Sequence, residues 1–298
     1  MPESRSEAPP TIAIVAAGAM GASVGSTLVS HGVPVLTCIE GRSAATRERA
    51  LRARMQLASR AELGSADLLL STVPSDQAVC VAQALLEAGA LREGGALYVD
   101  CNPLNPATLA TLSQLLARAG CGFVDACILG VASSERASAR VRLCTSGPRA
   151  AELDRLAAYG LEIQRLSGPL GTASALRLGI SAVSKGLVAL LTLVAAPAEA
   201  SGVGALLYQE LHRSHAALLD WVARQSARLP TEAQRWSAEL QEVAGGPVAD
   251  ARARVFAEMA QYFADLAASP TENALVSGAL TAFFGRTPQP ARNPTAPP

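Results

Sequence analysis

One lysine stands out among the residues that could do chemistry. Lys185 is the only lysine among 25 lysine and arginine residues, and it lies in a largely apolar stretch, residues 172–196. Burial lowers the pKa of an amine, whereas a guanidinium stays charged, so this lysine could serve as a general acid, a general base or a substrate anchor. The alternative is a structural lysine, which snorkels to the surface or forms an ion pair where two domains meet. Both interpretations stay open.

A glycine turn near the start of the chain is the second such feature. An apolar run at residues 12–15 leads into AAGAMG, residues 16–21, which fits the G-x-G-x-x-G pattern except for alanine at its first position. In that pattern a strand ends in a tight turn, and the free N–H groups of the following helix bind a pyrophosphate. The residues expected at the phosphates are Gly18, Ala19, Met20 and Gly21. The alternative is an ordinary helix start beside a strand.

The end of the next apolar run indicates which dinucleotide would bind. Residues 33–39 run out into Glu40, Gly41, Arg42 and Ser43. A carboxylate at this place binds the adenosine ribose of NAD, whereas an arginine accommodates the 2′-phosphate of NADP. Arg42 and Ser43 together offer a guanidinium fork and a hydroxyl, which favours NADP and leaves NAD as the alternative. Arg42 could instead simply begin the basic surface helix at residues 44–54.

These residues need elements that position them, and the first half of the chain alternates between strand and helix patterns. Such alternation predicts an α/β Rossmann domain with a mainly parallel, doubly wound sheet, in which ligands bind at the carboxyl ends of the strands. The expected strands are residues 12–15, 33–39, 66–73, 96–100, 122–126, 141–144 and 162–166. The strand signal ends at the Gly/Pro cluster of residues 167–171, and helical periodicity follows at residues 172–196, 206–227, 231–243, 248–268 and 271–284.

The domain organisation follows from this change of pattern. We expect a disordered lead-in at residues 1–10, an NAD(P)-binding domain at 11–168, an all-α substrate and dimerisation domain at 169–285, and a disordered tail at 286–298. The most apolar later run, around residues 186–196, is shorter than a bilayer-spanning helix, so no membrane partner is expected.

Composition narrows the partners and the compartment. The 25 basic and 25 acidic side chains cancel, which argues against nucleic acid as a partner. The six cysteines contain no C-x-x-C pair, and His212 and His215 have no further ligand beside them, so no metal site is expected. The cysteines fit a reducing compartment, and we expect a cytoplasmic protein that acts on a small molecule.

A series of motifs resembles a known family. In order they are GAMG, VPSD, VDCNPLNPAT, FVDACILG and GTASALRLGISAVSKG, and together they resemble the 6-phosphogluconate dehydrogenase and β-hydroxyacid dehydrogenase superfamily. The second half, with AQRWSAELQEV, is most similar to a bacterial branch with an uncharacterised conserved helical domain. The resemblance implies an NAD(P)-dependent dehydrogenase and a homodimer in which each helical domain helps to close its partner's site. It also implies that Val73 and Pro74 flank the nicotinamide and that Asn102 reaches the reaction site.

The chain departs from this family at two places. The family's substrate loop contains Ser-Gly-Gly, and the matching residues here are Leu129, Gly130 and Val131, which indicates a substrate more apolar than 6-phosphogluconate. The family's proton-shuttling lysine and its asparagine one turn later are matched by Arg177 and Ser181. Since arginine stays protonated at physiological pH, it can orient an anion but is a poor proton shuttle.

The sequence therefore predicts an NADP-preferring oxidoreductase that moves a hydride between the nicotinamide and a small secondary alcohol or ketone. Arg177 would hold an anionic or polarised group, Lys185 or a water molecule would pass the proton, and Asn102 would hydrogen-bond the reacting oxygen. Two alternatives stay open: an imine reductase on the same scaffold, and a catalytically silent NADP-binding protein.

Overall fold

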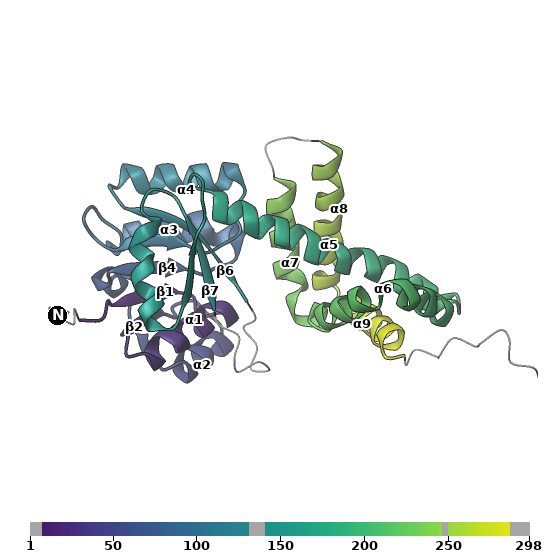
Figure 1. Cartoon of the computed structure of the whole chain (residues 1–298). Helices are drawn as coiled ribbons and strands as arrows, with labels where there is room; N and C mark the ends of the chain where they lie inside the picture. Colours follow the sequence, from purple (N-terminus) through teal and green to yellow (C-terminus); the bar gives the residue numbers. More distant parts are fainter. Residues whose placement is uncertain (1–7, 131–140, 246–249, 287–298) are drawn as a thin grey trace, which may run out of the picture. The chain divides into compact units, whose positions relative to one another are not determined.

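The computed structural model describes residues 8–130, 141–245 and 250–286 (Figure 1). The chain divides into two compact units, which are treated separately below. The first, called the sheet unit, runs to Gly179 and also includes Gly245; the second, called the helical unit, begins at Ile180. The expected disordered ends lie largely outside the described residues.

An eight-stranded sheet forms the centre of the sheet unit, with the order β3-β2-β1-β4-β5-β6-β7-β8. All neighbouring strands are parallel except β6 and β7, which confirms the mainly parallel, doubly wound sheet. The strands are β1 (Ile12–Val15), β2 (Val35–Cys38), β3 (Gln56–Leu57), β4 (Leu68–Ser71), β5 (Leu97–Asp100), β6 (Phe123–Leu129), β7 (Arg142–Ser146) and β8 (Glu162–Arg165). The order reverses between β1 and β4, which is where such sheets bind ligands.

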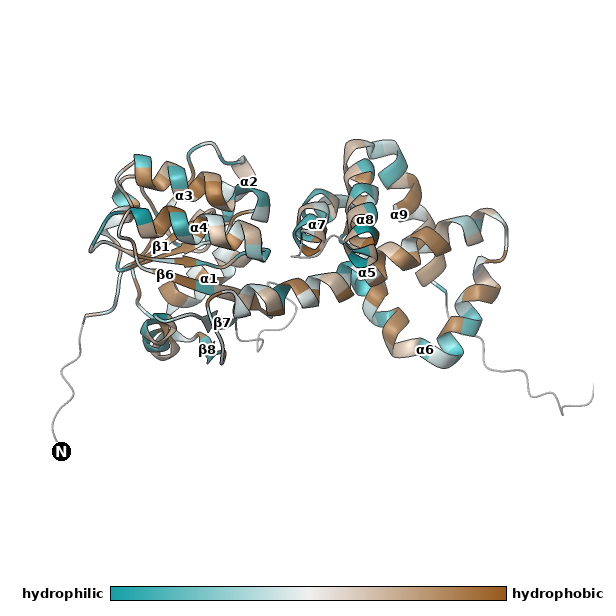
Figure 2. Ribbon diagram, turned by 90° about the horizontal axis from the view of Figure 1, so that it is seen from above, coloured by the Kyte–Doolittle hydropathy of each residue, from teal (hydrophilic) through white to brown (hydrophobic). Residues whose placement is uncertain are grey.

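The sheet is buried on both faces, as the continuous apolar strands predict. Along β1, Ile12 and Ile14 belong to one hydrophobic cluster, and Ala13 and Val15 belong to another on the opposite face. Figure 2 shows the strands in brown between helices that carry teal, hydrophilic residues. This two-sided burial fixes the register and therefore the level at which each strand ends.

Helices cover both faces of the sheet. One face carries α1 (Ala19–Ser30), α2 (Ala44–Arg52) and the 3₁₀ segment η3 (Ala150–Tyr159), and the other carries α3 (Ala78–Glu87) and α4 (Pro106–Arg118). Two short 3₁₀ turns, η1 (Glu62–Ser65) and η2 (Ser75–Gln77), lie beside β4 in the sequence. The segment after β7, η3, is thus a 3₁₀ helix rather than an α-helix.

The helical unit is built from the later part of α5 (Thr172–Ala200) with α6 (Gly204–Ser226), α7 (Leu229–Ala244), α8 (Ala251–Ala268) and α9 (Pro270–Phe284). Its core centres on aromatic contacts, among them Trp236 edge-on to Phe263 with ring centroids 5.4 Å apart. Helices α7 and α8 pack against each other, and Val188 and Ala189 of α5 are buried in the same core. An all-α second unit is therefore confirmed.

Helix α5 differs from expectation in two respects. The division between the units falls after Gly179, inside α5, rather than at Gly168. The helix also has 29 residues and runs past Pro197, so by length and composition alone it could cross a membrane, and the expectation of a segment too short to do so is wrong. Its Val188, Ala189 and Ala195 lie in the core of the helical unit, and 33% of the most apolar window of the helix is buried inside the structure.

Candidate functional site

The glycine turn joins β1 to α1 at the point where the strand order reverses. Ala16, at the first glycine position, has a left-handed backbone with φ 66°, so the turn keeps the conformation that glycine adopts most easily. The N–H of Gly18 donates to the carbonyl of Ala16 over 2.8 Å. Gly18 is the N-cap residue of α1, and no side chain caps the helix there. The first N–H groups of α1 are therefore not used by a capping side chain, as a phosphate-binding helix requires.

The two remaining glycines of the turn have different surroundings. A Cβ at Gly21 would overlap Thr72 Oγ1 and lie 2.7 Å from the carbonyl oxygen of Ala16, so α1 can approach β1 and β4 only with glycine at this position. A Cβ at Gly18 would meet nothing within 4 Å, which leaves open space on the side where a pyrophosphate backbone would approach. Gly18, Ala19, Met20 and Gly21 therefore fit a dinucleotide.

Two side chains that the sequence analysis missed hold this turn. Thr72 Oγ1 donates to the carbonyl of Ala16 over 2.8 Å, and Arg49 Nε donates to the carbonyl of Ala17 over 3.2 Å. Both come from distant parts of the chain, residues 56 and 32 positions away, so no local pattern marks them. They fix the turn in place before any ligand binds.

The predicted specificity residues follow β2. Glu40 is exposed, and Arg42 and Ser43 precede α2 directly. Ser43 is the N-cap residue of α2, and its Oγ accepts the N–H of Thr46 over 3.3 Å. Within the described residues the Arg42 side chain has no recorded hydrogen bond or ion pair, so its guanidinium is available to an anion.

The predicted nicotinamide neighbours, Val73 and Pro74, follow β4. Val73 is buried in the hydrophobic cluster on the α3 and α4 face, whereas Pro74 is exposed. The chain turns off the sheet at Pro74 into the 3₁₀ turn η2, as expected for a proline at the end of a strand. Their contact with a nicotinamide stays a prediction.

Asn102 lies just after β5 and is buried. Its backbone N–H donates to Asp100 Oδ1 over 2.9 Å, and its amide Nδ2 donates to Asp100 Oδ2 over 3.0 Å and to Ser71 Oγ over 3.3 Å. Both amide hydrogens thus have acceptors inside the protein. The polar atom that remains is Oδ1, an acceptor, which could receive the proton of an alcohol but could not donate to a ketone.

The carboxyl group that holds Asn102 is unusual. Asp100 is fully buried, and burial raises the pKa of its carboxyl group to about 7, although the hydrogen bonds from Asn102 and Ser71 lower it. The nearby charge of Asp125 adds to the increase in the pKa. A buried acid that titrates near neutrality beside a candidate binding residue is a frequent feature of functional sites.

Arg177 lies in the first turns of α5, within the sheet unit. Its positive charge acts on the thiol of Cys127 in β6: burial raises the pKa of Cys127 to about 12, and Arg177 opposes that increase. Cys127 packs with Cys144, Ala173 and Leu129 in a small apolar cluster. The charge of Arg177 thus acts on a thiol whose apolar cluster includes Leu129, one of the predicted substrate residues.

The other two predicted substrate residues follow β6. Gly130 has a left-handed backbone with φ 106°, which a side chain would strain. Val131 lies outside the described residues.

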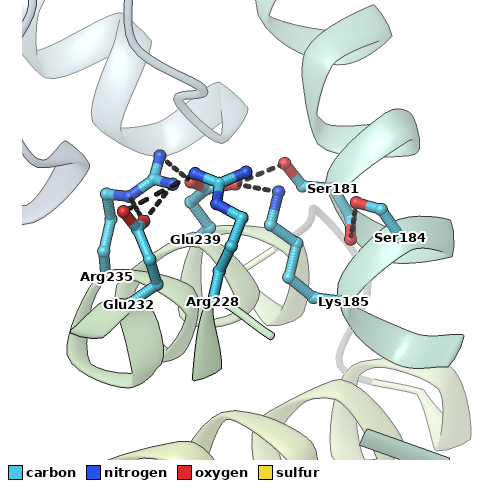
Figure 3. A network of polar contacts seen from close by, with 7 residues as sticks. All are labelled: Ser181, Ser184, Lys185, Arg228, Glu232, Arg235 and Glu239. Atoms are coloured by element: carbon cyan, nitrogen blue, oxygen red, sulfur yellow. Dashed lines mark hydrogen bonds and ion pairs between the residues drawn. The ribbon is translucent and has the colours of Figure 1, made fainter. Parts of the chain in front are cut away.

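Lys185 and Ser181 belong to the helical unit and meet at one carboxylate (Figure 3). Lys185 Nζ lies 2.9 Å from Glu239 Oε2, and Ser181 Oγ donates to the same oxygen over 2.7 Å. Arg235 Nη1 donates to Glu239 Oε1 over 3.0 Å. The ion pair is well buried, with side-chain exposures of 11% for Lys185 and 5% for Glu239.

This arrangement matches the structural interpretation of Lys185 as an ion-paired residue, and a catalytic role stays a prediction. Glu239 is buried rather than solvated, and it holds Lys185. Arg235 extends the cluster to Glu232, which also pairs with Arg228 at 3.5 Å (Figure 3). Among the described residues no group of side chains has the composition of a metal site.

Comparisons with known proteins place the sheet unit in a family. Residues 11–155 match the model of the NAD binding domain of 6-phosphogluconate dehydrogenase. An uncharacterised 28.5 kDa protein of Methanothermus fervidus is 28% identical over 161 residues, which are 53% of this chain and 59% of that protein. The alignment thus spans less than two thirds of this curated relative.

Solved structures show the same fold over most of the chain. A conserved protein of unknown function, described as structurally similar to 3-hydroxyacid dehydrogenases, is 27% identical with a TM-score of 0.61, covering 86% of this chain and 97% of its own. A 3-hydroxyisobutyrate dehydrogenase from Salmonella typhimurium is 16% identical with a TM-score of 0.68, covering 90% and 99%. An imine reductase from Myxococcus stipitatus in complex with NADP+ is 16% identical with a TM-score of 0.55, covering 92% and 100%.

The geometry of the glycine turn, the strand order of the sheet and these matches all indicate an NAD(P)-binding domain. The narrower assignment to a branch with an uncharacterised helical domain stays a prediction. Residues 11–155 of the sheet unit belong to the family of the NAD binding domain of 6-phosphogluconate dehydrogenase, and most of the chain is similar to a protein described as structurally similar to 3-hydroxyacid dehydrogenases.

Proposed function

We propose that the protein is an NADP-preferring oxidoreductase that transfers a hydride between the nicotinamide and a small secondary alcohol or ketone. The observation that carries this proposal is the pairing of two features in the sheet unit: a dinucleotide turn with an uncapped helix, and an arginine, Arg177, beside the apolar cluster of Cys127 and Leu129. When bound, the nicotinamide would supply or accept the hydride, and the protein would supply orientation and a proton.

The preference for NADP depends on Arg42. Its guanidinium has no recorded partner among the described residues and follows the strand whose end contacts the adenosine ribose in this fold. A bidentate, charge-assisted contact with a 2′-phosphate is worth more than a neutral hydrogen bond. Ser43 contributes less in this view, because its hydroxyl already caps α2.

Replacing Arg42 tests the cofactor preference. In Arg42→Ala the Kd of NADPH, measured by fluorescence titration, should rise about 10-fold to 100-fold, while that of NADH should change less than about twofold. Arg47→Ala, an exposed arginine of α2, is the matched control and should leave both constants unchanged. Equal losses for NADPH and NADH would contradict a 2′-phosphate contact.

The substrate would be held by its charge and its apolar part together. Arg177 would bind a carboxylate or a polarised oxygen, while Cys127 and Leu129 favour an apolar group. Because Arg177 stays protonated, the proton must travel by another group, for which Lys185 or a water molecule are the candidates. Asn102 would accept the hydroxyl hydrogen of an alcohol through Oδ1.

A screen of hydroxy acids, ketones and imines, followed by NADPH fluorescence, tests the activity itself. On the best substrate, Arg177→Ala should raise KM and Lys185→Arg should lower kcat, because arginine keeps the ion pair with Glu239 but cannot shuttle a proton. Full kcat in Lys185→Arg would remove Lys185 from the proton path. Tight NADPH binding without turnover across the panel would support the catalytically silent alternative.

Imine reduction is the second candidate function. It is favoured by arginine in place of the superfamily's lysine and by the apolar cluster beside it. Turnover of 2-methyl-1-pyrroline with NADPH, and of no hydroxy acid, would decide for it.

A homodimer is part of the proposal. A stripe of exposed apolar residues follows one face of α5 in the helical unit: Ile180, Val183, Leu190 and Val194. A groove of about 560 Å³ is lined by Leu193 of α5 and by Val255 and Met259 of α8. Arg254 and Glu258, which carry opposite charges, also line this groove. Such a surface suits a second copy related by a two-fold axis, because each arginine could meet its partner's glutamate.

Light scattering of charged variants tests this surface. Val183→Glu with Leu190→Glu should shift the protein from dimer to monomer. Leu275→Glu is the control and should stay dimeric. Leu275 is exposed (71%), as the stripe residues are, but it belongs to α9 rather than α5. A monomeric wild-type protein would refute the dimer.

The cytoplasm is the proposed location. The six cysteines are free thiols, which supports a reducing compartment. Fractionation of cells that express the chain would test this location.

A further inference from the structure

The start of α5 is bound to the sheet by one buried side chain, Asp125 of β6. This carboxylate accepts hydrogen bonds from Ser146 Oγ (2.7 Å), the N–H groups of Gly171 (3.0 Å), Ala173 (3.0 Å) and Ser174 (3.1 Å), and Ser174 Oγ (2.5 Å). Asp125 has no exposed surface. The free N–H groups of the first turn of α5 are thus satisfied by a carboxylate from the sheet.

A helix is usually capped by a side chain from its own N-terminus, and α5 is not. The nearest local candidate, Thr172, donates its hydroxyl to the carbonyl of Pro169 over 2.8 Å. Asp125 lies 46 residues before Gly171 in the sequence. A long-range cap of this kind ties the helix to a rigid strand rather than only ending it, and its negative charge is favoured at the positive end of the helix.

The anchor reaches a second strand. Ser174 Oγ also lies 3.3 Å from the backbone carbonyl of Asn102, just after β5. The first turn of α5 is therefore bound to Asp125 of β6, to Ser146 of β7 and to the residue that follows β5. Together these contacts fix its position and its rotation about the helix axis.

Arg177 follows this anchored turn directly. It lies four residues after Ala173, about one helical turn and 6 Å along the axis. Its charge acts on Cys127, two residues after Asp125 in β6. The position of the Arg177 backbone, and the direction in which its side chain leaves the helix, therefore depend on where Asp125 holds α5.

We propose that Asp125 is a positioning residue, which holds α5 so that the guanidinium of Arg177 meets the substrate. This inference rests on the proposed function, in which Arg177 binds the substrate. Asp125 has no exposed surface with which to touch a substrate, and both of its carboxylate oxygens already accept hydrogen bonds from the protein.

Asp125→Asn is the main variant. It keeps the shape of the side chain but replaces one accepting oxygen by an NH₂ group, which cannot accept hydrogen bonds from the N–H groups of α5. Hydrogen exchange in a peptide covering residues 171–177 should become at least about 10-fold faster. On the best substrate kcat/KM should fall about 100-fold, because a misplacement of about 1 Å costs that much, while the Kd of NADPH stays within twofold. Asp154→Asn, a half-exposed aspartate that pairs with Arg165, is the control and should change neither.

A double-mutant cycle distinguishes positioning from a general loss of structure. If Asp125 acts through Arg177, then Asp125→Asn should cost little further kcat/KM in an Arg177→Ala background. Asp125→Glu, which restores the charge, should recover part of the exchange protection and part of the turnover. If Asp125→Asn does not fold, Ser174→Ala removes one donor of the anchor and should show the same changes at a smaller scale.

Each outcome supports or overturns one part of the proposal. Unchanged exchange in residues 171–177 overturns the anchor. Faster exchange with full turnover, or losses that simply add to those of Arg177→Ala, overturns the positioning role. If the wild-type protein turns over no substrate, the proposed function fails, and the exchange measurement still decides whether Asp125 holds α5.

Discussion

Two buried carboxylates, Asp125 in the sheet unit and Glu239 in the helical unit, are satisfied in opposite ways. Asp125 is surrounded by neutral donors, mostly backbone N–H groups at a helix start. Glu239 is bound by two cations, Lys185 and Arg235, and by the hydroxyl of Ser181. Only a substitution to proline removes a backbone donor from Asp125, whereas replacing either cation side chain removes a charge from Glu239. The sheet unit should therefore be robust at its anchor, and the helical unit sensitive at its ion pair.

The largest expected effect breaks the ion pair of the helical unit. Glu239→Leu leaves Lys185 and Arg235 without this acceptor and should lower the free energy of unfolding by about 3–5 kcal/mol. Lys185→Met combined with Glu239→Leu should recover at least half of that loss. Urea unfolding followed by tryptophan fluorescence measures it, because both tryptophans, Trp221 and Trp236, lie in this unit. A loss below about 1 kcal/mol in the single variant would show that the pair contributes little.

A pH effect in the sheet unit should come second. Because burial raises the pKa of Asp100 to about 7, its protonated form is favoured in the folded state. The stabilisation is complete below the ordinary pKa near 4 and is lost as the pH rises through 7. Between pH 5 and pH 8 the loss should be about 2–3 kcal/mol.

Hydrogen exchange of a peptide that covers β5 follows this loss locally, with each rate corrected for the intrinsic effect of pH. In Asp100→Asn the pH dependence should flatten. An equally steep dependence in that variant would assign the titration to a group other than Asp100.

One glycine in each unit extends the comparison between the sheet unit and the helical unit. Gly21→Ala should destabilise the sheet unit by about 1–3 kcal/mol and weaken NADPH binding, because its Cβ has no room beside Thr72 and Ala16. Gly278→Ala in α9 has open space and should stabilise the helical unit by about 0.5–1 kcal/mol. Thermal unfolding of both variants checks the opposite signs, and two losses of equal size would contradict the packing argument.

The smallest expected effect concerns the first position of the glycine turn. Ala16 has φ 66°, which costs an alanine about 1–2 kcal/mol, whereas glycine in the unfolded chain costs about 0.4–1 kcal/mol in entropy. Ala16→Gly should therefore stabilise the protein by no more than about 1 kcal/mol. A measured destabilisation would mean that the methyl group of Ala16 makes contacts worth more than the strain.

The sequence predicted the elements well where the signal was local. Apolar strands such as β1 and β4 and the glycine turn at residues 16–21 were recognisable, because burial on both faces and a tight turn each leave a pattern in neighbouring residues. The two-residue strand β3 was missed, since Gln56 and Leu57 are both exposed and give no apolar run. The 3₁₀ geometry of η3 was not predicted either.

The candidate site was less predictable, because its contacts are long-range. The partners of Asp125 at the start of α5 lie 46 or more residues later in the sequence. Ser181, a partner of Glu239, lies 58 residues earlier in the sequence. Such pairs depend on how strands and helices pack, which spacing along the chain does not reveal.

The shielded ammonium of Lys185 has a practical consequence. As the chain's only lysine, with a side chain that is 11% exposed and ion-paired, it should react slowly with acylating reagents while the helical unit stays folded. Apart from the chain's amino terminus, no other amine competes for the label. The rate at which Lys185 is acylated is therefore a single-site gauge of how often the helical unit opens, readable by mass spectrometry without any substrate.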